Sequence, residues 1–232
     1  MIVIKAGGNA IWPRASNGID LEFMECLFAF VRHTIHERNE KVVLLPGGVG
    51  GQHFIAWARE SGCSEAEMNH VGCDLINLAA TIISRYFLAR SQSLFTTCPV
   101  VALAIDDLDM YANSYDLILS GVSMTGGVSS DSLAALAAEH LKAKLIFIKN
   151  RYPYEAEHEQ FAHEHDNAIS LRKISEYIGS KDRSFRAGCH ASIDQVCLRV
   201  LERAQLDVTL ISKKDLAHWH SGNALNMIQI RD

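Results

Sequence analysis

The stretch Ile2-Val3-Ile4-Lys5-Ala6-Gly7-Gly8-Asn9 begins with a short apolar run and ends in paired glycines. An apolar run of this length, bounded by glycine, is typical of a buried strand. Glycines at the end of a strand let backbone N–H groups approach an anion closely, because no Cβ stands in the way. Lys5 places a cation where the strand would end. The stretch therefore predicts a phosphate-binding site at this point.

A second stretch of the same kind, Val42-Val43-Leu44-Leu45-Pro46-Gly47-Gly48-Val49-Gly50-Gly51, follows about one helix-length later. Its glycine cluster is denser than a tight strand–helix turn requires, so we expect the glycines to contact a ligand. Two such loops near the start of the chain predict a site that holds more than one phosphoryl group.

Short apolar runs alternate with helical patterns along the chain, which predicts an α/β fold: a three-layer α/β/α sandwich with a mainly parallel central sheet. The run 145–148 lacks polar alternation, as expected for a strand buried on both faces. Ser64 and Glu67 have the spacing of a capping box at a helix start. The predicted strands are 2–5, 41–45, 100–105, 116–120, 144–149, 207–211 and 226–230. The predicted helices are 20–38, 64–90, 131–142, 170–178 and 191–205.

Length and composition indicate one globular domain over residues 1–232 in the cytoplasm. The net charge of −5 and the lack of a basic stripe argue against a nucleic-acid partner. No apolar run approaches the length of a membrane span, and the N-terminus lacks the layout of a signal peptide. The six cysteines lack C-x-x-C spacing and are expected to be reduced thiols.

The segment 150–168 is rich in aromatic, histidine and acidic residues, and we interpret it as a long loop or lid. The spacing of His158, His163 and His165 matches no known metal site, so a solvated loop is the simpler interpretation. Trp57, Met110 and the aromatic residues of 20–38 are expected in the core.

A third glycine-bearing stretch narrows the type of phosphate site. It runs Ser120-Gly121-Val122-Ser123-Met124-Thr125-Gly126-Gly127-Val128-Ser129-Ser130-Asp131-Ser132 and leads into an Ala/Leu-rich helical pattern. Asp131 suits the N-cap of that helix, because its carboxylate can accept N–H bonds. No G-x-x-x-x-G-K-[ST] motif is present, and the glycine spacing at 47–51 does not match a dinucleotide fingerprint.

The three stretches, taken in this order, resemble the amino-acid kinase superfamily. The family's K-x-G-G-S corresponds to Lys5-Ala6-Gly7-Gly8-Asn9, and its second glycine loop to residues 47–51. Its [TN]-x-D-[ST]-x-A-A segment corresponds to residues 129–135. The resemblance implies an amino-acid-kinase fold, ATP as phosphoryl donor, Mg²⁺ bridging the nucleotide phosphates with few protein ligands, a small-molecule substrate and a homo-oligomer.

The resemblance also implies a role for individual residues. Lys5 and Asp131 are the implied catalytic pair, with Lys5 neutralising the transferred phosphoryl group and Asp131 orienting a cation. The residues implied to bind the nucleotide phosphates are Gly7, Gly8 and Asn9, and we add Ser130 and Ser132 beside Asp131. Lys149 is a further candidate from its position, because a lysine at the carboxyl end of a central strand points toward the ligand site, although a surface salt bridge is the alternative. Gly47 and Gly48 are implied to bind the substrate. We add Gly50, Gly51, His70 and Asp74 as candidate substrate-binding residues, with a half-buried structural histidine as the alternative for His70.

Within the superfamily, residues 64–70, 128–132 and 193–201 resemble the [5-(aminomethyl)furan-3-yl]methyl phosphate kinases of methanofuran synthesis. The expected function is thus a small-molecule kinase acting on a phosphate- or carboxylate-bearing metabolite. Asn9 replaces the usual serine, and Lys149-Asn150-Arg151 stands where many members have a nucleotide-base segment. The late G-G-M-x-x-K element is also absent. These departures keep open a non-catalytic oxoanion or nucleotide binder resembling molybdenum storage proteins.

Overall fold

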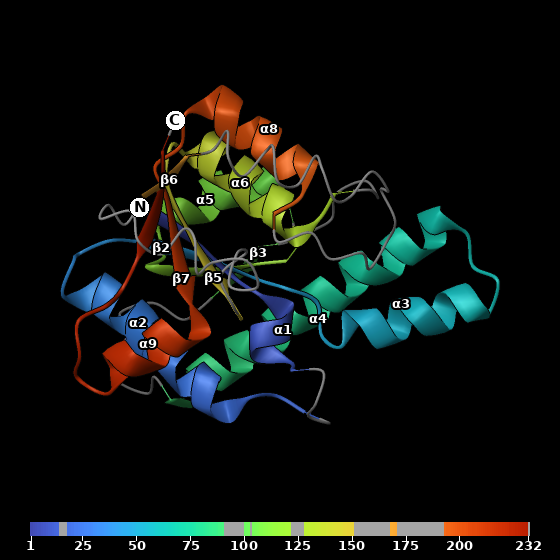
Figure 1. The fold of residues 1–232 in the computed structure, drawn as a ribbon, viewed down its shortest axis with the longest axis horizontal. Coiled ribbons are helices and arrows are strands. Elements are labelled where there is room, and N and C mark those ends of the chain that lie inside the picture. The colour runs from blue at the N-terminus through green and yellow to red at the C-terminus, as the bar shows by residue number, and fades with distance from the viewer. Residues whose placement is uncertain are drawn as a thin grey trace.

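The computed structural model describes residues 1–13, 18–90, 100–102, 104–121, 128–150, 168–170 and 193–231. In these residues eight strands form one sheet in the order β3-β4-β2-β1-β5-β7-β8-β6. Adjacent strands run parallel except β7 and β8. Helices cover both faces of the sheet (Figure 1). The prediction of a three-layer α/β/α fold with a mainly parallel sheet is confirmed.

The strands lie close to their predicted positions. They are β1 (Ile2–Ala6), β2 (Val42–Pro46), β3 (Val100–Ala102), β4 (Leu117–Ser120), β5 (Lys144–Lys149), β6 (Ala168–Ser170), β7 (Val208–Ser212) and β8 (Ile228–Arg231). The run predicted over 100–105 ends early, because Ala104 precedes a helix whose Asp107 carboxylate accepts from the Ala104 N–H at 2.9 Å. Of the helix predicted over 170–178, Ser170 belongs to β6 and the rest lies outside the described residues.

The described helices include four that the sequence predicted and four that it did not. The predicted ones are α2 (Leu21–His36), α4 (Glu65–Arg90), α6 (Ser130–Leu141) and α8 (Gln195–Ala204). The others are α1 (Gly8–Ile11), α3 (Gly51–Glu60), α5 (Ile105–Ala112) and α9 (Lys213–His220). These four helices begin within a few residues of a strand end. Because they are short, their apolar periodicity spans few turns and gives little signal in the sequence.

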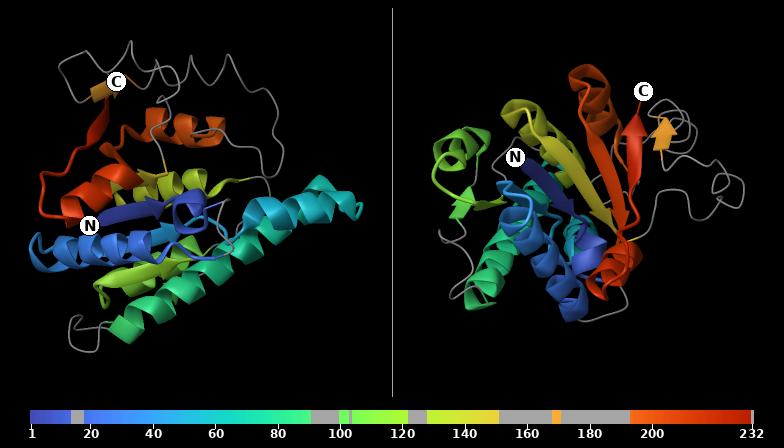
Figure 2. Two further views of the ribbon diagram at one scale, coloured as in Figure 1. Left: turned by 60° about the horizontal axis from the view of Figure 1, so that its bottom comes forward. Right: turned by 90° about the vertical axis from the view of Figure 1, so that its left-hand side faces the viewer.

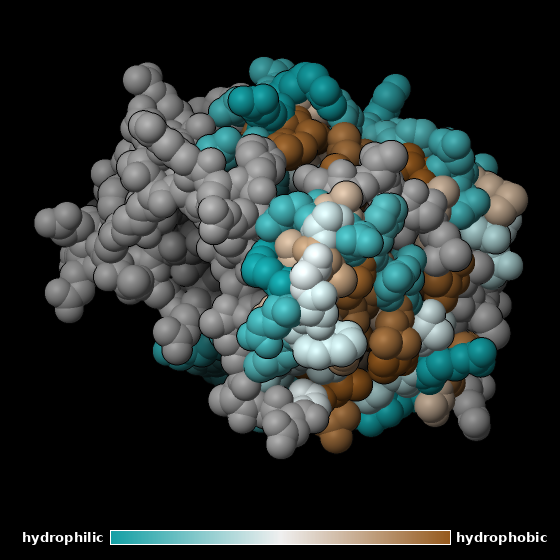
Figure 3. Space-filling view, turned by 90° about the vertical axis from the view of Figure 1, so that its right-hand side faces the viewer, coloured by the Kyte–Doolittle hydropathy of each residue, from teal (hydrophilic) through white to brown (hydrophobic). Residues whose placement is uncertain are grey.

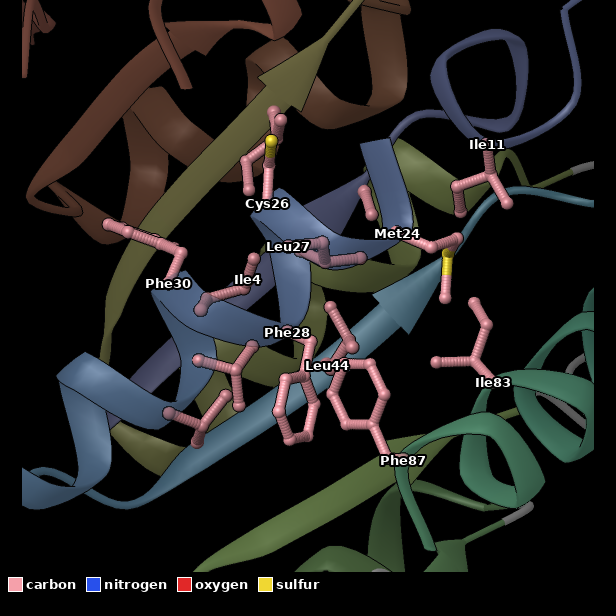
Figure 4. Close-up of a cluster of buried hydrophobic side chains, with 14 of the residues drawn as sticks. Ile4, Ile11, Met24, Cys26, Leu27, Phe28, Phe30, Leu44, Ile83 and Phe87 are labelled. Carbon is pink, nitrogen blue, oxygen red and sulfur yellow. The ribbon is translucent and has the colours of Figure 1, made fainter. Parts of the chain in front are cut away.

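The side chains of each central strand alternate between two cores. Val3 and Phe147 belong to the core that includes α6 and α8, whereas Ile4 belongs to the core under α2 and α4. Figure 4 shows this second core, where Phe28 of α2 meets Phe87 of α4 edge-on, with ring centroids 5.1 Å apart. The aromatic residues of α2 are buried as expected.

Helix α4 is the longest described helix, and its capping box is present. The Ser64 N–H donates to Glu67 at 2.7 Å, and the Glu67 N–H donates to the Ser64 hydroxyl at 3.3 Å. Among the described residues α4 alone is long and apolar enough to cross a membrane. A core helix meets the same test, and Ile83 and Phe87 of α4 are fully buried against the sheet side of the fold.

Helix α3 and the first turns of α4 form a hairpin that extends from the rest of the molecule (Figures 1 and 2). The expectation that Trp57 and Met110 are core residues is wrong, since they are 67% and 60% exposed. Phe54, one turn before Trp57, is 50% exposed. Figure 3, which views the end that carries the hairpin, shows hydrophobic side chains at the surface. Trp57 projects outward because α3 packs against α4 through Ile55 and Ala58 instead.

Several expectations fall on residues outside the described ranges. The proposed lid lies almost wholly in 151–167, together with His158, His163 and His165. Of the cysteines, Cys26, Cys63, Cys73 and Cys197 are free thiols, as expected, and the other two are not among the described residues.

Candidate functional site

The candidate site lies at the carboxyl ends of β1, β2 and β5. Strand β1 pairs with β2 on one side and β5 on the other. The chain runs from β1 through β2 and β3 to β4 on one side and then crosses to β5 on the other, so the strand order reverses at β1. In open parallel sheets, ligands bind in the crevice that forms where strand order reverses in this way. The first glycine loop follows β1 directly, and the second follows β2.

Three charged side chains meet at this edge of the sheet, and we call them the Lys5–Asp131–Lys149 cluster. The Lys5 Nζ lies 2.6 Å from Asp131 Oδ1, and the Lys149 Nζ contacts the other carboxylate oxygen. The Lys5, Asp131 and Lys149 side chains are only 6%, 9% and 13% exposed. One carboxylate thus holds two lysines that come from the adjacent strands β1 and β5.

Burial and charge act in opposite directions on these groups. Burial raises the pKa of Asp131, but Lys149 and Lys5 outweigh it and hold that pKa at about 2. Burial lowers the pKa of Lys5 below its ordinary value, and Lys149 adds to this effect while Asp131 opposes it. The Asp131 carboxylate is therefore ionised at neutral pH and is a weak proton acceptor.

The carboxylate of Asp131, at the start of α6, contacts the two lysines and does not cap the helix. The expectation that Asp131 is the N-cap is wrong, because Ser129 takes that position and its hydroxyl accepts from the Asp131 and Ser132 N–H groups at 3.1 and 3.2 Å. A serine cap satisfies these amides without a carboxylate. Asp131 therefore lies in the first turn with its side chain directed to the cluster.

Asp194 supports this arrangement from the neighbouring helix, and sequence reasoning did not identify it as a site residue. It caps α8 by accepting from Val196 and Cys197 N–H groups at 2.8 and 3.0 Å. It also accepts from the Ser132 hydroxyl at 2.7 and 2.8 Å and from the Ser129 hydroxyl. Its position before an apolar helical pattern was a signal for capping, but only the fold shows that it joins two helix starts.

The two glycine loops are in direct backbone contact. A Cβ added to Gly47 would lie 2.3 Å from the Gly8 nitrogen and 2.6 Å from the Gly8 Cα, which no side chain can tolerate. The Gly7 N–H donates to Ile148 O and the Gly47 N–H to Ala6 O, both at 2.8 Å. These two amides hold the strand ends together and are not available to a ligand.

Other amides in the loops remain open. Within the described part of the chain, the N–H groups of Gly8, Asn9 and Gly48 donate no hydrogen bond. Open amides beside buried lysines are suited to anion binding. Gly50 has a left-handed backbone with φ of 54° and precedes α3, and Gly51 is its first residue.

The remaining predicted site residues lie further from the cluster. Ser132 is fully buried and its hydroxyl faces Asp194, whereas Ser130 is only partly buried. Asp74 and His70 are exposed residues one turn apart on α4. The α4 backbone reaches the second loop at Leu75, whose carbonyl accepts from the Val49 N–H at 3.3 Å. Asp74 thus adjoins that loop, and neither Asp74 nor His70 contacts the cluster in the described structure.

The side chains around the cluster do not resemble a metal site in which the protein supplies most of the ligands. The described residues contain no group of three or more His, Cys, Asp or Glu side chains that could hold a metal ion. The buried carboxylate of the cluster, Asp131, is already held by two lysines. These residues fit a divalent cation only if phosphate oxygens of a ligand supply most of its coordination.

Sequence comparison finds relatives of known activity, while no family model matches the chain. The uridylate kinase of Methanosarcina acetivorans is 25% identical over 219 residues, covering 93% of this chain and 88% of that protein. The uridylate kinase of Methanothrix thermoacetophila is 25% identical over 228 residues, covering 94% and 92%.

Solved structures share the fold. The uridylate kinase of Archaeoglobus fulgidus superposes with a TM-score of 0.66 at 20% identity and covers 99% of this chain and 98% of that one. The UMP kinase of Ureaplasma parvum gives 0.69 at 12% identity, with 100% and 99% covered. The aspartate kinase of Synechocystis gives 0.65, covering 92% of this chain and 38% of that one.

Proposed function

We propose that this chain, whose relatives support an ATP-dependent phosphotransferase of the amino-acid kinase superfamily, transfers the γ-phosphoryl group of ATP to a small phosphate monoester. The observation that carries the proposal is the buried Lys5–Asp131–Lys149 cluster, which lies at the strand ends between two glycine loops. UMP is the first candidate acceptor, because the similar proteins are uridylate kinases.

The donor side of the site is formed by β1 and the loop that follows it. Phosphoryl transfer depends on in-line positioning and charge neutralisation rather than on covalent chemistry by the protein. Lys5 neutralises charge on the transferred group, and the open N–H groups of Gly8 and Asn9 bind the β- and γ-phosphates. With few ligands from the described residues, a bound Mg²⁺ would be held mainly through phosphate oxygens and would supply positive charge against the negative charge that develops on the leaving oxygen.

The described residues of the site offer no suitable general base, and this narrows the choice of acceptor molecule. Asp131 has a pKa of about 2 and is held by two lysines, so it is a poor acceptor for a hydroxyl proton. A phosphate monoester needs no base, since its attacking oxygen is already an anion. The open Gly48 amide and the adjoining part of α4 at Asp74 are the proposed acceptor side.

The test is a transfer assay with purified protein, ATP and Mg²⁺ against a panel of phosphate monoesters. The panel contains UMP, CMP, AMP, GMP and [5-(aminomethyl)furan-3-yl]methyl phosphate, and ³¹P NMR identifies the product. We expect a new phosphoanhydride on UMP and a loss of at least about 100-fold in kcat for Lys5→Ala. Preference for the furan phosphate instead would assign the chain to the methanofuran branch.

One control variant and two contrary outcomes keep the assay interpretable. Lys144→Ala removes an exposed lysine from the opposite end of β5 and is expected to retain full activity. If no acceptor is phosphorylated and elemental analysis finds molybdenum or tungsten in the purified protein, the non-catalytic oxoanion binder is the better assignment. Undiminished turnover by Lys5→Ala contradicts the role given to Lys5.

A further inference from the structure

We infer that Lys149 is a second catalytic cation, which binds the transferred phosphoryl group together with Lys5 and is held in readiness by Asp131. This inference rests on the proposed kinase function and deepens it. It assigns Lys149 to the chemical step rather than to recognition of the nucleotide alone.

The first support is the shared carboxylate. Lys5 contacts Asp131 Oδ1 at 2.6 Å, and Lys149 contacts Asp131 Oδ2, so both ammonium groups lie around one small carboxylate. Because the two ammonium groups are held at the two oxygens of one carboxylate, both can donate hydrogen bonds to oxygens of a single phosphoryl group bound beside them. A lysine that recognised only the base or ribose of a nucleotide would not need this contact.

The second support is the position of Lys149 in the sheet. Strands β1 and β5 pair in parallel, with Lys5 opposite Phe147, and Lys149 lies two residues further on the same face. The Lys149 Nζ lies 5.2 Å from the centroid of the Phe147 ring, which restricts the side chain from one side. Lys149 therefore lies on the same face of the sheet as Lys5, at the edge where the glycine loop follows β1.

The third support is the balance of charge. The cluster contains two lysines and one carboxylate, and in the described structure no further acidic side chain contacts either lysine. Buried charge is costly unless it is paired. Asp194 does not relieve the excess, because serine hydroxyls and helix N–H groups occupy its carboxylate. An anionic ligand completes the pairing, and a phosphoryl group supplies the required charge.

The chemical step then balances without a proton on either lysine being transferred. The bond between the γ-phosphorus and the β–γ bridging oxygen breaks, and its electron pair stays on ADP. A bond forms between the γ-phosphorus and an anionic oxygen of the acceptor. Lys5 and Lys149 donate hydrogen bonds to the oxygens of the group in flight, whose charge they stabilise throughout.

The experiment compares Lys149→Met, Lys149→Arg and the control Lys144→Met, which alters the exposed residue at the other end of β5. We measure kcat and KM with ATP and the best acceptor, the Kd for ADP and the thermal unfolding temperature. Lys149→Met is expected to lower kcat by about 100-fold or more, with a change in the ADP Kd of less than about fivefold. Lys149→Arg is expected to recover about tenfold of that loss, and Lys144→Met to match wild type.

Each outcome has a distinct meaning. A Lys149→Met variant that keeps kcat within twofold of wild type overturns the inference, and so does one that raises only the KM for ATP. A kcat loss that Arg does not recover, together with a lower unfolding temperature, indicates a structural role and also overturns it. If wild type itself transfers nothing, it is the proposed function that fails, and the three variants then have no kcat to compare.

Discussion

The Asp194 carboxylate accepts two contacts from the Ser132 hydroxyl, at 2.7 and 2.8 Å, and thereby ties the start of α8 to the start of α6. Asp131 precedes Ser132 directly and carries the carboxylate of the cluster. We therefore expect Asp194, which forms no ion pair with either lysine in the described structure, to act as a positioning residue that sets the geometry of Asp131.

Replacing Asp194 tests this relationship. Asp194→Ala removes the cap of α8 and leaves the buried Ser132 hydroxyl without its acceptor, so we expect a loss of about 1–3 kcal/mol in the free energy of unfolding. We also expect kcat to fall more than KM rises, because Asp131 is displaced. Chemical denaturation and steady-state kinetics measure these effects. Glu202→Ala, an exposed change on α8, should leave both unaltered, and an equal effect of the two variants would falsify the link.

The contact between the glycine loops predicts that Gly47 tolerates no side chain. Gly47→Ala would place a methyl group 2.3 Å from the Gly8 nitrogen, so the loops must separate. We expect a loss of about 1–3 kcal/mol in stability and a strong loss of activity, since the open Gly8 amide moves with its loop.

The matched control is Gly72→Ala, on α4. Its added Cβ would meet only the end of the Ile55 side chain at 3.9 Å, and alanine favours a helix over glycine by up to about 1 kcal/mol. Its unfolding midpoint in urea should equal or exceed that of wild type. A Gly47→Ala protein as stable and active as Gly72→Ala would contradict the close contact.

The pKa of Asp131 predicts a contribution to stability that acid removes. Its pKa falls from an ordinary 3.8 to about 2 on folding, so the unfolded chain binds the proton more readily. The contribution is fully present above pH 3.8 and is lost as pH falls through about 2. Its size is about 2 kcal/mol, from the constant that relates a pKa shift to free energy.

Urea unfolding of wild type and Asp131→Asn at pH 5 and pH 2.5 measures this contribution. We expect the free-energy difference between the two proteins to be large at pH 5 and smaller at pH 2.5. Other ionised carboxylates titrate in both proteins and cancel in the comparison. A difference that stays constant between these pH values would show that Asp131 keeps an ordinary pKa.

Truncating a buried aromatic residue and truncating an exposed one are expected to cost different amounts of unfolding free energy. Phe87 is fully buried and packs edge-on against Phe28, so Phe87→Ala is expected to cost about 3–5 kcal/mol. Trp57 is 67% exposed, and Trp57→Ala is expected to change stability by less than about 0.5 kcal/mol. Thermal unfolding of both variants checks the burial, and a larger loss for Trp57→Ala would be inconsistent with it.

Local patterns predicted the elements whose signals are strong. The buried strand 144–149 and the capping box at Ser64 were read directly from residue type and spacing, since both depend on neighbours within a few residues. Short helices such as α9 were missed because eight residues show little periodicity. The burial of Trp57 was predicted wrongly because residue type alone does not tell which face of α3 meets α4.

The sequence by itself determined the α/β class, the two glycine loops and the lysine at the first strand end, because strand runs and glycine clusters are local properties of the chain. Only the tertiary structure decided that Lys5 and Lys149 share the carboxylate of Asp131, that Ser129 rather than Asp131 caps α6, and that Asp194 supports them from another helix. These contacts join residues far apart in the chain, and the pairing of β1 with β5 brings them to one edge of the sheet.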